Sequence, residues 1–269
     1  MTDGPVQRLL SIMAALRDPV RGCPWDRQQT MTSLVPHTLE EAYEVAEAVE
    51  QGDLEAIRDE LGDLLFQVVF YSRLAEERRA FDFGDVAEAV SDKLVRRHPH
   101  VFGEAVVASA ADQARAWEDL KQRERNARAG GRAPGALDGV ASSLPALSRA
   151  VKLQRRAARV GFDWRDPRQV LAKVEEELGE LREVLDDGNR ERLEHELGDV
   201  LLAVTNLARH LHIDPETALR RANRRFEQRF RYMESRLISQ GREMSECPPE
   251  ALEALWEEAK GRTEDPASS

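Results

Sequence analysis

The chain has 269 residues, of which 41% are hydrophobic, 33% charged and only 6% aromatic. This length suffices for two domains of ordinary size, and an abundance of Ala, Leu, Glu and Arg favours helices over sheets. The net charge of −11 argues against nucleic acid as the default partner. No stretch reaches the roughly 20 apolar residues that a membrane-spanning helix needs.

Two cysteines, Cys23 and Cys247, lie far apart, and each is followed by proline. They form no C-x-x-C pair and no disulfide framework. The N-terminus also lacks a basic region followed by a long apolar run, as a secretory signal would have. These features predict a cytoplasmic protein with reduced thiols.

In chain order, the first element expected is a short amphipathic helix over residues 5–17, followed by an irregular segment over 22–30. Thr38 is the expected N-cap of the next helix. A later helix is expected to start at Phe81–Gly84 and to stop before Pro99. No useful strand-like alternation occurs, so the predicted fold is all-α.

Small residues, Gly and Pro dominate residues 126–143, which leaves little to bury and predicts a flexible linker. The second half then repeats the plan of the first. We therefore expect one domain over residues 1–125 and another over 144–269.

The second half contains two acidic helical segments joined by a turn at Gly188. Glu180 and Glu196 lie eight positions on either side of this glycine. Glu177 and Asp199 lie eleven positions on either side. In an antiparallel helical hairpin both pairs meet at matching heights, and the i, i+3 spacing puts each helix's two acids on one face.

The same mirror spacing occurs 136 positions earlier, around Gly52. Glu44 and Glu60 form its inner pair, and Glu41 and Asp63 its outer pair. A repeated long pattern indicates an internal duplication. Beside the acids, apolar residues recur at helical period and predict stripes that face a core. On the second arms these stripes include Leu61, Leu65, Val68, Leu197, Leu201 and Val204.

Four converging carboxylates repel one another unless cations lie between them, so each hairpin predicts a metal site. Oxygen ligands with no His or Cys nearby suit Mg²⁺ or Mn²⁺. Arg225 and Arg229 lie one turn apart and share a helix face, although ion pairing with surface Glu residues is an alternative role for them. Acids, metal and arginines together provide the layout for phosphoryl or nucleotidyl chemistry, without a P-loop.

The pattern EExxE followed at fixed distance by ExxD, with GCPWDRQQT, RRHPHVF, ELGDLLFQVVFY and NLARHL, resembles the MazG family in its two-domain bacterial form. The resemblance covers nearly the whole chain. It implies tandem all-α helical bundle domains and a homodimer in which helices of both subunits complete a bundle. It also implies hydrolysis of nucleoside triphosphates to monophosphate and pyrophosphate. The oxygen ligands make Mg²⁺ the expected ion, with Mn²⁺ as a substitute. Composition and charge predict no membrane and no nucleic-acid partner.

By this resemblance, metal in the second half activates a water that attacks the α-phosphorus. The expected catalytic and metal-binding residues are Glu177, Glu180, Glu196 and Asp199. The expected phosphate-binding residues are Lys173, Arg225, Arg229 and Lys260. Trp256 is expected to pack near the nucleotide, although a plain core role is an equal alternative. Asn223 is expected to assist.

The first half carries a full set of expected metal ligands, namely Glu41, Glu44, Glu60 and Asp63. However, Lys173 stands four residues before the first acid of its repeat, where the first repeat has His37, which is mostly neutral at pH 7. Arg192 is matched by Ala56. The richer positive charge predicts that the second half binds the triphosphate and is the main catalyst.

Other functions fit the sequence less well. A non-enzymatic acidic interaction protein remains the principal alternative to an enzyme of nucleotide-pool sanitation or control. A di-iron bundle requires Glu-x-x-His pairs, and no Glu stands three residues before His195 or His210. A nucleic-acid binder built on the Arg-rich residues 220–231 is opposed by the net charge.

Overall fold

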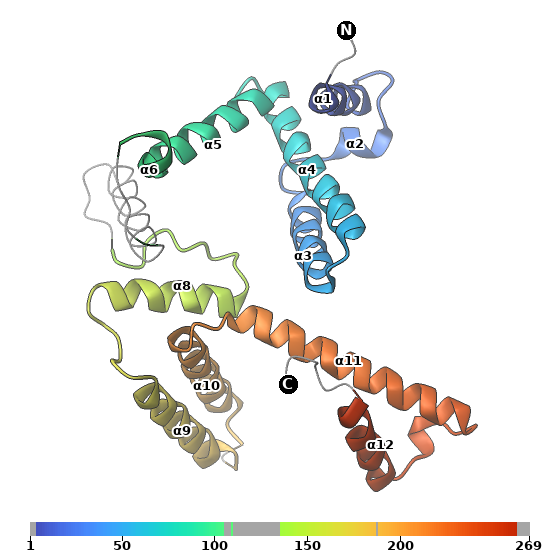
Figure 1. The fold of residues 1–269 in the computed structure, drawn as a ribbon, viewed down its shortest axis with the longest axis vertical. Coiled ribbons are helices and arrows are strands. Elements are labelled where there is room, and N and C mark those ends of the chain that lie inside the picture. Colours follow the sequence, from blue (N-terminus) through green and yellow to red (C-terminus); the bar gives the residue numbers. More distant parts are fainter. Residues whose placement is uncertain (1–3, 105–108, 110–134, 187, 263–269) are drawn as a thin grey trace. The chain divides into compact units, whose positions relative to one another are not determined.

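The computed structural model describes residues 4–104, 109, 135–186 and 188–262 (Figure 1). Helices and connecting turns make up these residues, and no strand occurs among them, which confirms the all-α prediction. The chain divides into two compact units, Met1–Arg123 and Glu124–Ser269. The first half of the predicted linker, 126–134 of 126–143, lies outside the described residues. Within the described parts, no helix combines the length and apolarity that crossing a membrane requires.

The N-terminal unit is organised around one long helix, α4, which contacts α1, α3 and α5. A short helix, α6, packs on α5. The helices are α1 (Pro5–Leu16), α2 (Pro24–Gln28), α3 (Val35–Gln51), α4 (Leu54–Glu77), α5 (Phe83–Arg97) and α6 (Pro99–Phe102).

The C-terminal unit repeats this plan around α10, which contacts α8, α9 and α11. The last helix, α12, packs on α11. The elements are α8 (Ala146–Arg159), α9 (Pro167–Val184), α10 (Arg190–His210), α11 (Pro215–Ser239), a 3₁₀ turn η1 (Met244–Glu246) and α12 (Pro249–Arg262).

Both acidic hairpins turn by the same local device. Gly52 ends α3 in the left-handed region at φ 76°, and Gly188 has φ 64° between α9 and α10. This conformation favours glycine. The next residue then caps the return helix: the Asp53 side chain accepts from two backbone N–H groups of α4, and Asn189 does the same for α10.

Other helix ends follow their sequence signals, with one exception. Asp82 and Asp85 form a capping box at the start of α5. The prediction that Thr38 caps α3 was wrong, because α3 already begins at Val35. Pro36 is favoured in a first helical turn, so Thr38 falls inside the helix. Its hydroxyl donates to the Leu34 carbonyl at 3.0 Å.

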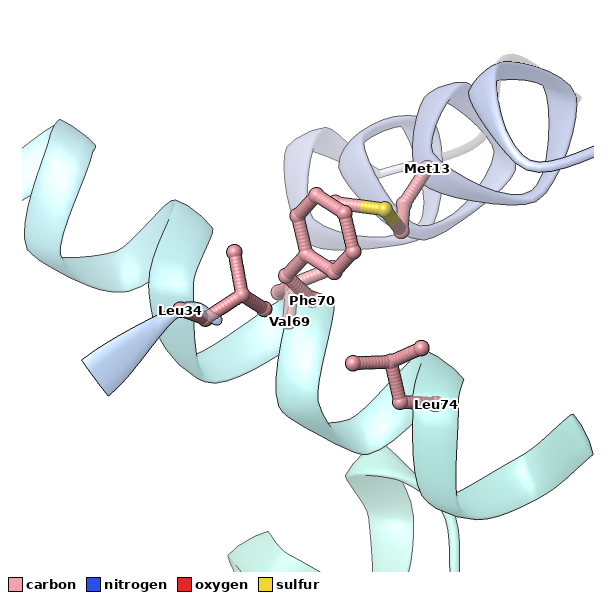
Figure 2. Close-up of a cluster of buried hydrophobic side chains, with 5 residues drawn as sticks. All are labelled: Met13, Leu34, Val69, Phe70 and Leu74. Atoms are coloured by element: carbon pink, nitrogen blue, oxygen red, sulfur yellow. The ribbon is translucent and has the colours of Figure 1, made fainter. Parts of the chain in front are cut away.

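The core of the N-terminal unit joins α1, the start of α3 and α4 (Figure 2). Figure 2 shows Met13, Leu34, Val69, Phe70 and Leu74 gathered in this core. Phe70 is completely buried at its centre. The ring therefore joins α4 to both neighbouring segments.

The apolar stripes on the second arms of the hairpins are only partly buried. Val69 and Val200 lie in the core, as the sequence predicts, but one side of each stripe is between 38% and 52% exposed, contrary to that prediction: Leu61, Leu65, Val68, Leu197, Leu201 and Val204. Helical period predicts that residues share a face, but the described helices of one chain do not cover this face. The same exposed stripe thus occurs once on α4 and once on α10, and no helix among the described residues covers either one.

Candidate active site

The C-terminal hairpin brings the predicted acids together across α9 and α10. Carboxylate oxygens of Glu177, Glu196 and Asp199 lie within 4.8 Å of one another. Glu180, one turn along α9, belongs to the same electrostatic group. Its pKa is raised, first by the charge of Glu177, then by desolvation and by Glu196, while Lys173 acts in the opposite direction.

Glu177 is the buried member of this group, with 7% of its surface exposed. Its Oε1 lies 2.8 Å from the Lys173 ammonium, which also donates to Glu176 at 2.7 Å. Hydrogen bonds to Glu176 and then Glu177 raise the pKa of Lys173, so it remains charged. Lys173 therefore neutralises part of the acidic cluster, besides any role toward phosphate.

A divalent cation fits this donor set. Three carboxylate oxygens from two helices approach one another closely, although like charges at this range repel. Hard oxygen ligands of this kind are the ones that Mg²⁺ and Mn²⁺ prefer. The expectation that no His lies nearby was wrong, because His195 Nε2 is 3.3 Å from Asp199 Oδ2. The acids hold their places on regular helices, so the cluster is formed by the fold itself.

The N-terminal hairpin makes a matching group, in which oxygens of Glu41, Glu60 and Asp63 lie within 4.8 Å of one another. Burial, then the charges of Asp63 and Glu44, raises the pKa of Glu41. Burial, then Glu44 and Asp63, raises the pKa of Glu60. All four predicted acids of this repeat therefore interact, as the mirror spacing predicts.

No lysine neutralises the N-terminal acids from the position that Lys173 occupies in the other repeat. His37 stands there instead, and its ring makes an edge contact with Trp25 at 5.8 Å between centroids. Its Nδ1 lies 3.7 Å from Glu40, outside the acidic group. The two hairpins therefore share their carboxylates but differ in the neighbouring charge.

A pocket of about 170 Å³ opens beside the C-terminal acids. Lys173, Glu177 and Asp199 line it on the side of the cluster. Trp164 and Asn206 line it as well, together with apolar side chains of α10. A ligand held at the acids therefore has a cavity next to it.

Asp163 fixes the geometry of this pocket. Arg209 donates to both of its carboxylate oxygens, one at 3.0 Å, and His210 Nε2 lies 2.9 Å away. Desolvation raises the pKa of Asp163, but the bonds from Arg209 and His210 outweigh it, so the pKa is lowered overall. The ionised Asp163 thus ties the loop before α9 to the end of α10.

Sequence reasoning assigned no role to Trp164, Asn206 or Arg209. They lie in the segments GFDW and NLARHL, which carry no metal-ligand or nucleophile spacing. Their convergence depends on how α8, α9 and α10 pack, which residue spacing within one helix does not express. The available signal was a Trp shortly before the acidic hairpin in each repeat.

The remaining predicted substrate residues form a second group on α11 and α12. The Arg229 guanidinium lies 5.7 Å from the centre of the Trp256 ring, and Phe226 contacts the same ring at 5.4 Å. Arg225 is half-buried on α11, Asn223 is exposed there, and Lys260 is half-buried on α12. The Trp256 ring therefore contacts both a cation, Arg229, and an apolar side chain, Phe226.

One chain thus divides the predicted substrate residues into two groups. Lys173 pairs with the acids, and Arg192 lies one turn before Glu196 on α10. The second group is Asn223, Arg225, Arg229, Trp256 and Lys260 on α11 and α12. Trp256 and Lys260 are carried by α12, which packs on α11.

A family model, the MazG nucleotide pyrophosphohydrolase domain, matches residues 29–102 and 165–233, which contain both acidic hairpins. The chain is 47% identical over 259 residues to a nucleoside triphosphate pyrophosphohydrolase of Escherichia coli K12, covering 95% of this chain and 97% of that protein. It is 44% identical over 258 residues to a nucleoside triphosphate pyrophosphohydrolase/pyrophosphatase MazG of Thermotoga maritima, covering 96% of each.

A crystal structure of a mazG-related protein from Thermotoga maritima matches 43% of this chain and 98% of that one, with 29% identity and a TM-score of 0.37. The sequence comparisons extend over both repeats and nearly the full length of two relatives. With two acidic helical hairpins inside the matched segments, this chain belongs to the MazG nucleotide pyrophosphohydrolase family.

Proposed function

We propose that the protein hydrolyses nucleoside triphosphates to monophosphate and pyrophosphate, by attack of water on the α-phosphorus. Mg²⁺ is the proposed metal, with Mn²⁺ as a substitute. The observation that carries the proposal is the cluster of Glu177, Glu196 and Asp199 across α9 and α10, beside a pocket. Relatives that match the full chain are named for this activity.

The chain's own residues bind and orient the reactants in this proposal. Glu177 is held by Lys173 and shielded from bulk water, so its carboxylate keeps one position. Glu180 and Glu196 extend the site toward solvent, where a triphosphate enters. When bound, a divalent cation supplies charge neutralisation for phosphate oxygens and activation of water. Lys173 adds fixed positive charge at the same place.

The proposed active form is a homodimer. Exposed apolar stripes on α4 and α10 support it, because each is a contiguous helix face that the described helices of one chain leave uncovered. Arg225, Arg229 and Trp256 lie on α11 and α12, outside the hairpin that carries the acids, and a second copy of these helices is able to supply them to a cluster. We place this activity in sanitation or control of the cytoplasmic nucleotide pool.

Product analysis tests the reaction. Each common and deaminated nucleoside triphosphate is incubated with the protein and Mg²⁺, and the products are separated by chromatography. Monophosphate and pyrophosphate, lost with EDTA or in Glu180→Ala, are the expected result. Diphosphate and phosphate would contradict attack at the α-phosphorus. A folded, Mg²⁺-binding protein without turnover would favour the non-enzymatic interaction protein.

A further inference from the structure

We infer that Asn206 binds the base of the substrate, by donating a hydrogen bond from its side-chain amide to an acceptor atom of the heterocycle. The inference rests on the proposed function and deepens it, because it assigns the pocket beside the acids to the base. It makes Asn206 a specificity-determining residue of the C-terminal site.

Asn206 is a buried polar side chain with an unused donor. Only 4% of its surface is exposed, and its Oδ1 accepts from Arg209 Nε at 2.9 Å. Arginine only donates, so this bond fixes which end of the amide is oxygen. The NH₂ group makes no hydrogen bond within the described residues, yet Asn206 lines the pocket and its nitrogen is not sealed off. The donor is accessible from the pocket, so it is available to an acceptor atom of a ligand.

The amide is held rigidly in place. Arg209, which accepts no bond itself, is fixed by two bonds to the Asp163 carboxylate, and its side chain is 11% exposed. His210 contacts the same carboxylate. A donor fixed in this way recognises an acceptor at one position, because rotating it away would break the bond to Arg209.

Size and surroundings assign the pocket to the base rather than to the whole nucleotide. Its volume of about 170 Å³ is below the roughly 300–1,000 Å³ of sites for drug-sized ligands. Lys173, Glu177 and Asp199 define the end where phosphates and metal belong. The rings of Phe162 and Trp164 also line the pocket and are partly exposed. Aromatic side chains of this kind stack on planar bases.

The N-terminal repeat supplies a natural contrast. Phe70 stands 136 positions before Asn206, as Glu41 stands before Glu177. It fills the core that Figure 2 shows, with Met13 and Leu34 against it. A phenyl ring offers no donor at the place where the C-terminal repeat presents one. The pocket of the N-terminal unit, of about 580 Å³, has no residue of the acidic group in its lining.

The test measures the affinity of the full-length protein with Mg²⁺ for α,β-methylene-ATP, which the proposed reaction does not cleave, and for its 1-, 3- and 7-deaza analogues. Each analogue lacks one ring acceptor. We expect one of them to bind wild type about tenfold more weakly, since it leaves the Asn206 donor unpaired. In Asn206→Leu the parent and that analogue bind equally. Inorganic tripolyphosphate, which has no base, binds both proteins alike.

Three results would overturn the inference: equal binding of all analogues to wild type, an unchanged difference in Asn206→Leu, or an equal loss of tripolyphosphate affinity in that variant. If Asn206→Leu does not fold, Trp164→Ala replaces it, because this ring is partly exposed. It should lower the ratio of nucleotide to tripolyphosphate affinity about tenfold. If one deaza analogue binds more weakly as expected but no triphosphate is hydrolysed, only the proposed function is refuted. If triphosphates are hydrolysed but all analogues bind equally, only this inference is refuted.

Discussion

The two repeats of this chain share a hairpin and differ in what surrounds it. Each places acids at the same distances from a glycine turn, and in each three carboxylates meet within 4.8 Å. Around them, the C-terminal repeat has Lys173, Asn206 and a pocket, whereas the N-terminal repeat has His37 and Phe70. An acidic cluster is thus encoded within one hairpin, while a substrate site requires particular neighbours.

The difference also concerns charge. Glu177 is compensated by Lys173, but the raised pKa values of Glu41 and Glu60 record acids that repel one another after losing water by burial. The N-terminal cluster therefore depends more on an added cation. We expect both repeats to bind metal and only the C-terminal repeat to turn over substrate.

The strongest test of this asymmetry removes one equivalent acid from each repeat. Glu177→Gln should lower kcat/KM about a thousandfold, because it removes a charged ligand at the reacting phosphate. Glu41→Gln, the matched control, should leave kcat/KM within about twofold of wild type. Steady-state assays of pyrophosphate release measure both. Loss of activity in Glu41→Gln alone would reverse our assignment of the catalytic repeat.

The next effect concerns two arginines with different tasks. In the N-terminal unit Arg17 lies 5.5 Å from the Phe70 ring and donates to both Glu77 oxygens at 2.8 and 2.7 Å. Arg17→Met should destabilise that unit by about 3 kcal/mol, by breaking a largely buried pair, without changing kcat/KM. Calorimetric unfolding and kinetics are the measurements.

Arg209→Met in the C-terminal unit is the counterpart to Arg17→Met. It should lower both stability and nucleotide affinity, because Arg209 joins Asp163 to Asn206. An equal effect of both variants on nucleotide affinity would contradict the contrast between a filled core and a substrate pocket.

Metal linkage should depend on pH. The pKa values of Glu41, Glu60 and Glu180 are raised above their ordinary value of 4.5. At pH values just above 4.5 in EDTA, the folded protein therefore binds more protons than the unfolded chain. Stability then falls as pH rises through this window. At neutral pH, Mg²⁺ at a hundred times its Kd should raise the free energy of unfolding by about 2.7 kcal/mol. At pH 4.5 the increase should be smaller.

Thermal unfolding with Mg²⁺ and with EDTA at both pH values tests this linkage. Glu60→Gln should weaken the stabilisation by Mg²⁺ that the N-terminal unit contributes, while raising stability in EDTA. Stabilisation by Mg²⁺ that is equal at the two pH values would show that these acids do not bind it.

A smaller effect should follow from making the C-terminal repeat resemble the other. Lys173→His replaces a permanent cation by a mostly neutral ring and should lower kcat/KM about tenfold at pH 8. His37→Lys should give no added turnover, since the pocket position of that repeat is filled by Phe70. Recovery of activity in the N-terminal repeat by His37→Lys would mean that charge alone separates the two.

The smallest effects should be equal in the two repeats. Gly52→Ala and Gly188→Ala place a side chain at positive φ in open space, so only the backbone conformation is penalised. Each should cost about 1 kcal/mol of unfolding free energy. Thermal unfolding of the two variants measures this, and a clearly unequal loss would mean that one turn contributes tertiary contacts.

The sequence predicted what depends on spacing along one helix or one turn. The acids around Gly52 and Gly188 converge as expected because helical period and turn position are local properties. The predicted start of α3 at Thr38 was wrong, because the helix begins at Val35 with Pro36 in its first turn. Exposure of Leu61 and Leu201 was not predicted, because periodicity identifies a face without naming what covers it.

The pocket was also beyond local reasoning. Asn206 becomes a candidate binding residue only when Arg209 fixes its oxygen and Asp163 fixes Arg209, and Asp163 lies 46 residues before Arg209 in the chain. Likewise, the contact of Arg229 with the Trp256 ring joins α11 to α12, and no spacing within one helix predicts it. Contacts between distant segments decide such questions.

The mirror arrangement about each turn glycine also constrains how this family is able to change in length. One inserted residue in an arm rotates every later carboxylate by about 100° and moves it about 1.5 Å along the axis. A deletion or insertion between the acids therefore keeps the carboxylates together only when matching changes occur in the other arm or in the turn. In engineering terms, turn length is a means of setting the separation of the carboxylates, and with it the size of the ion they select, without substituting any ligand.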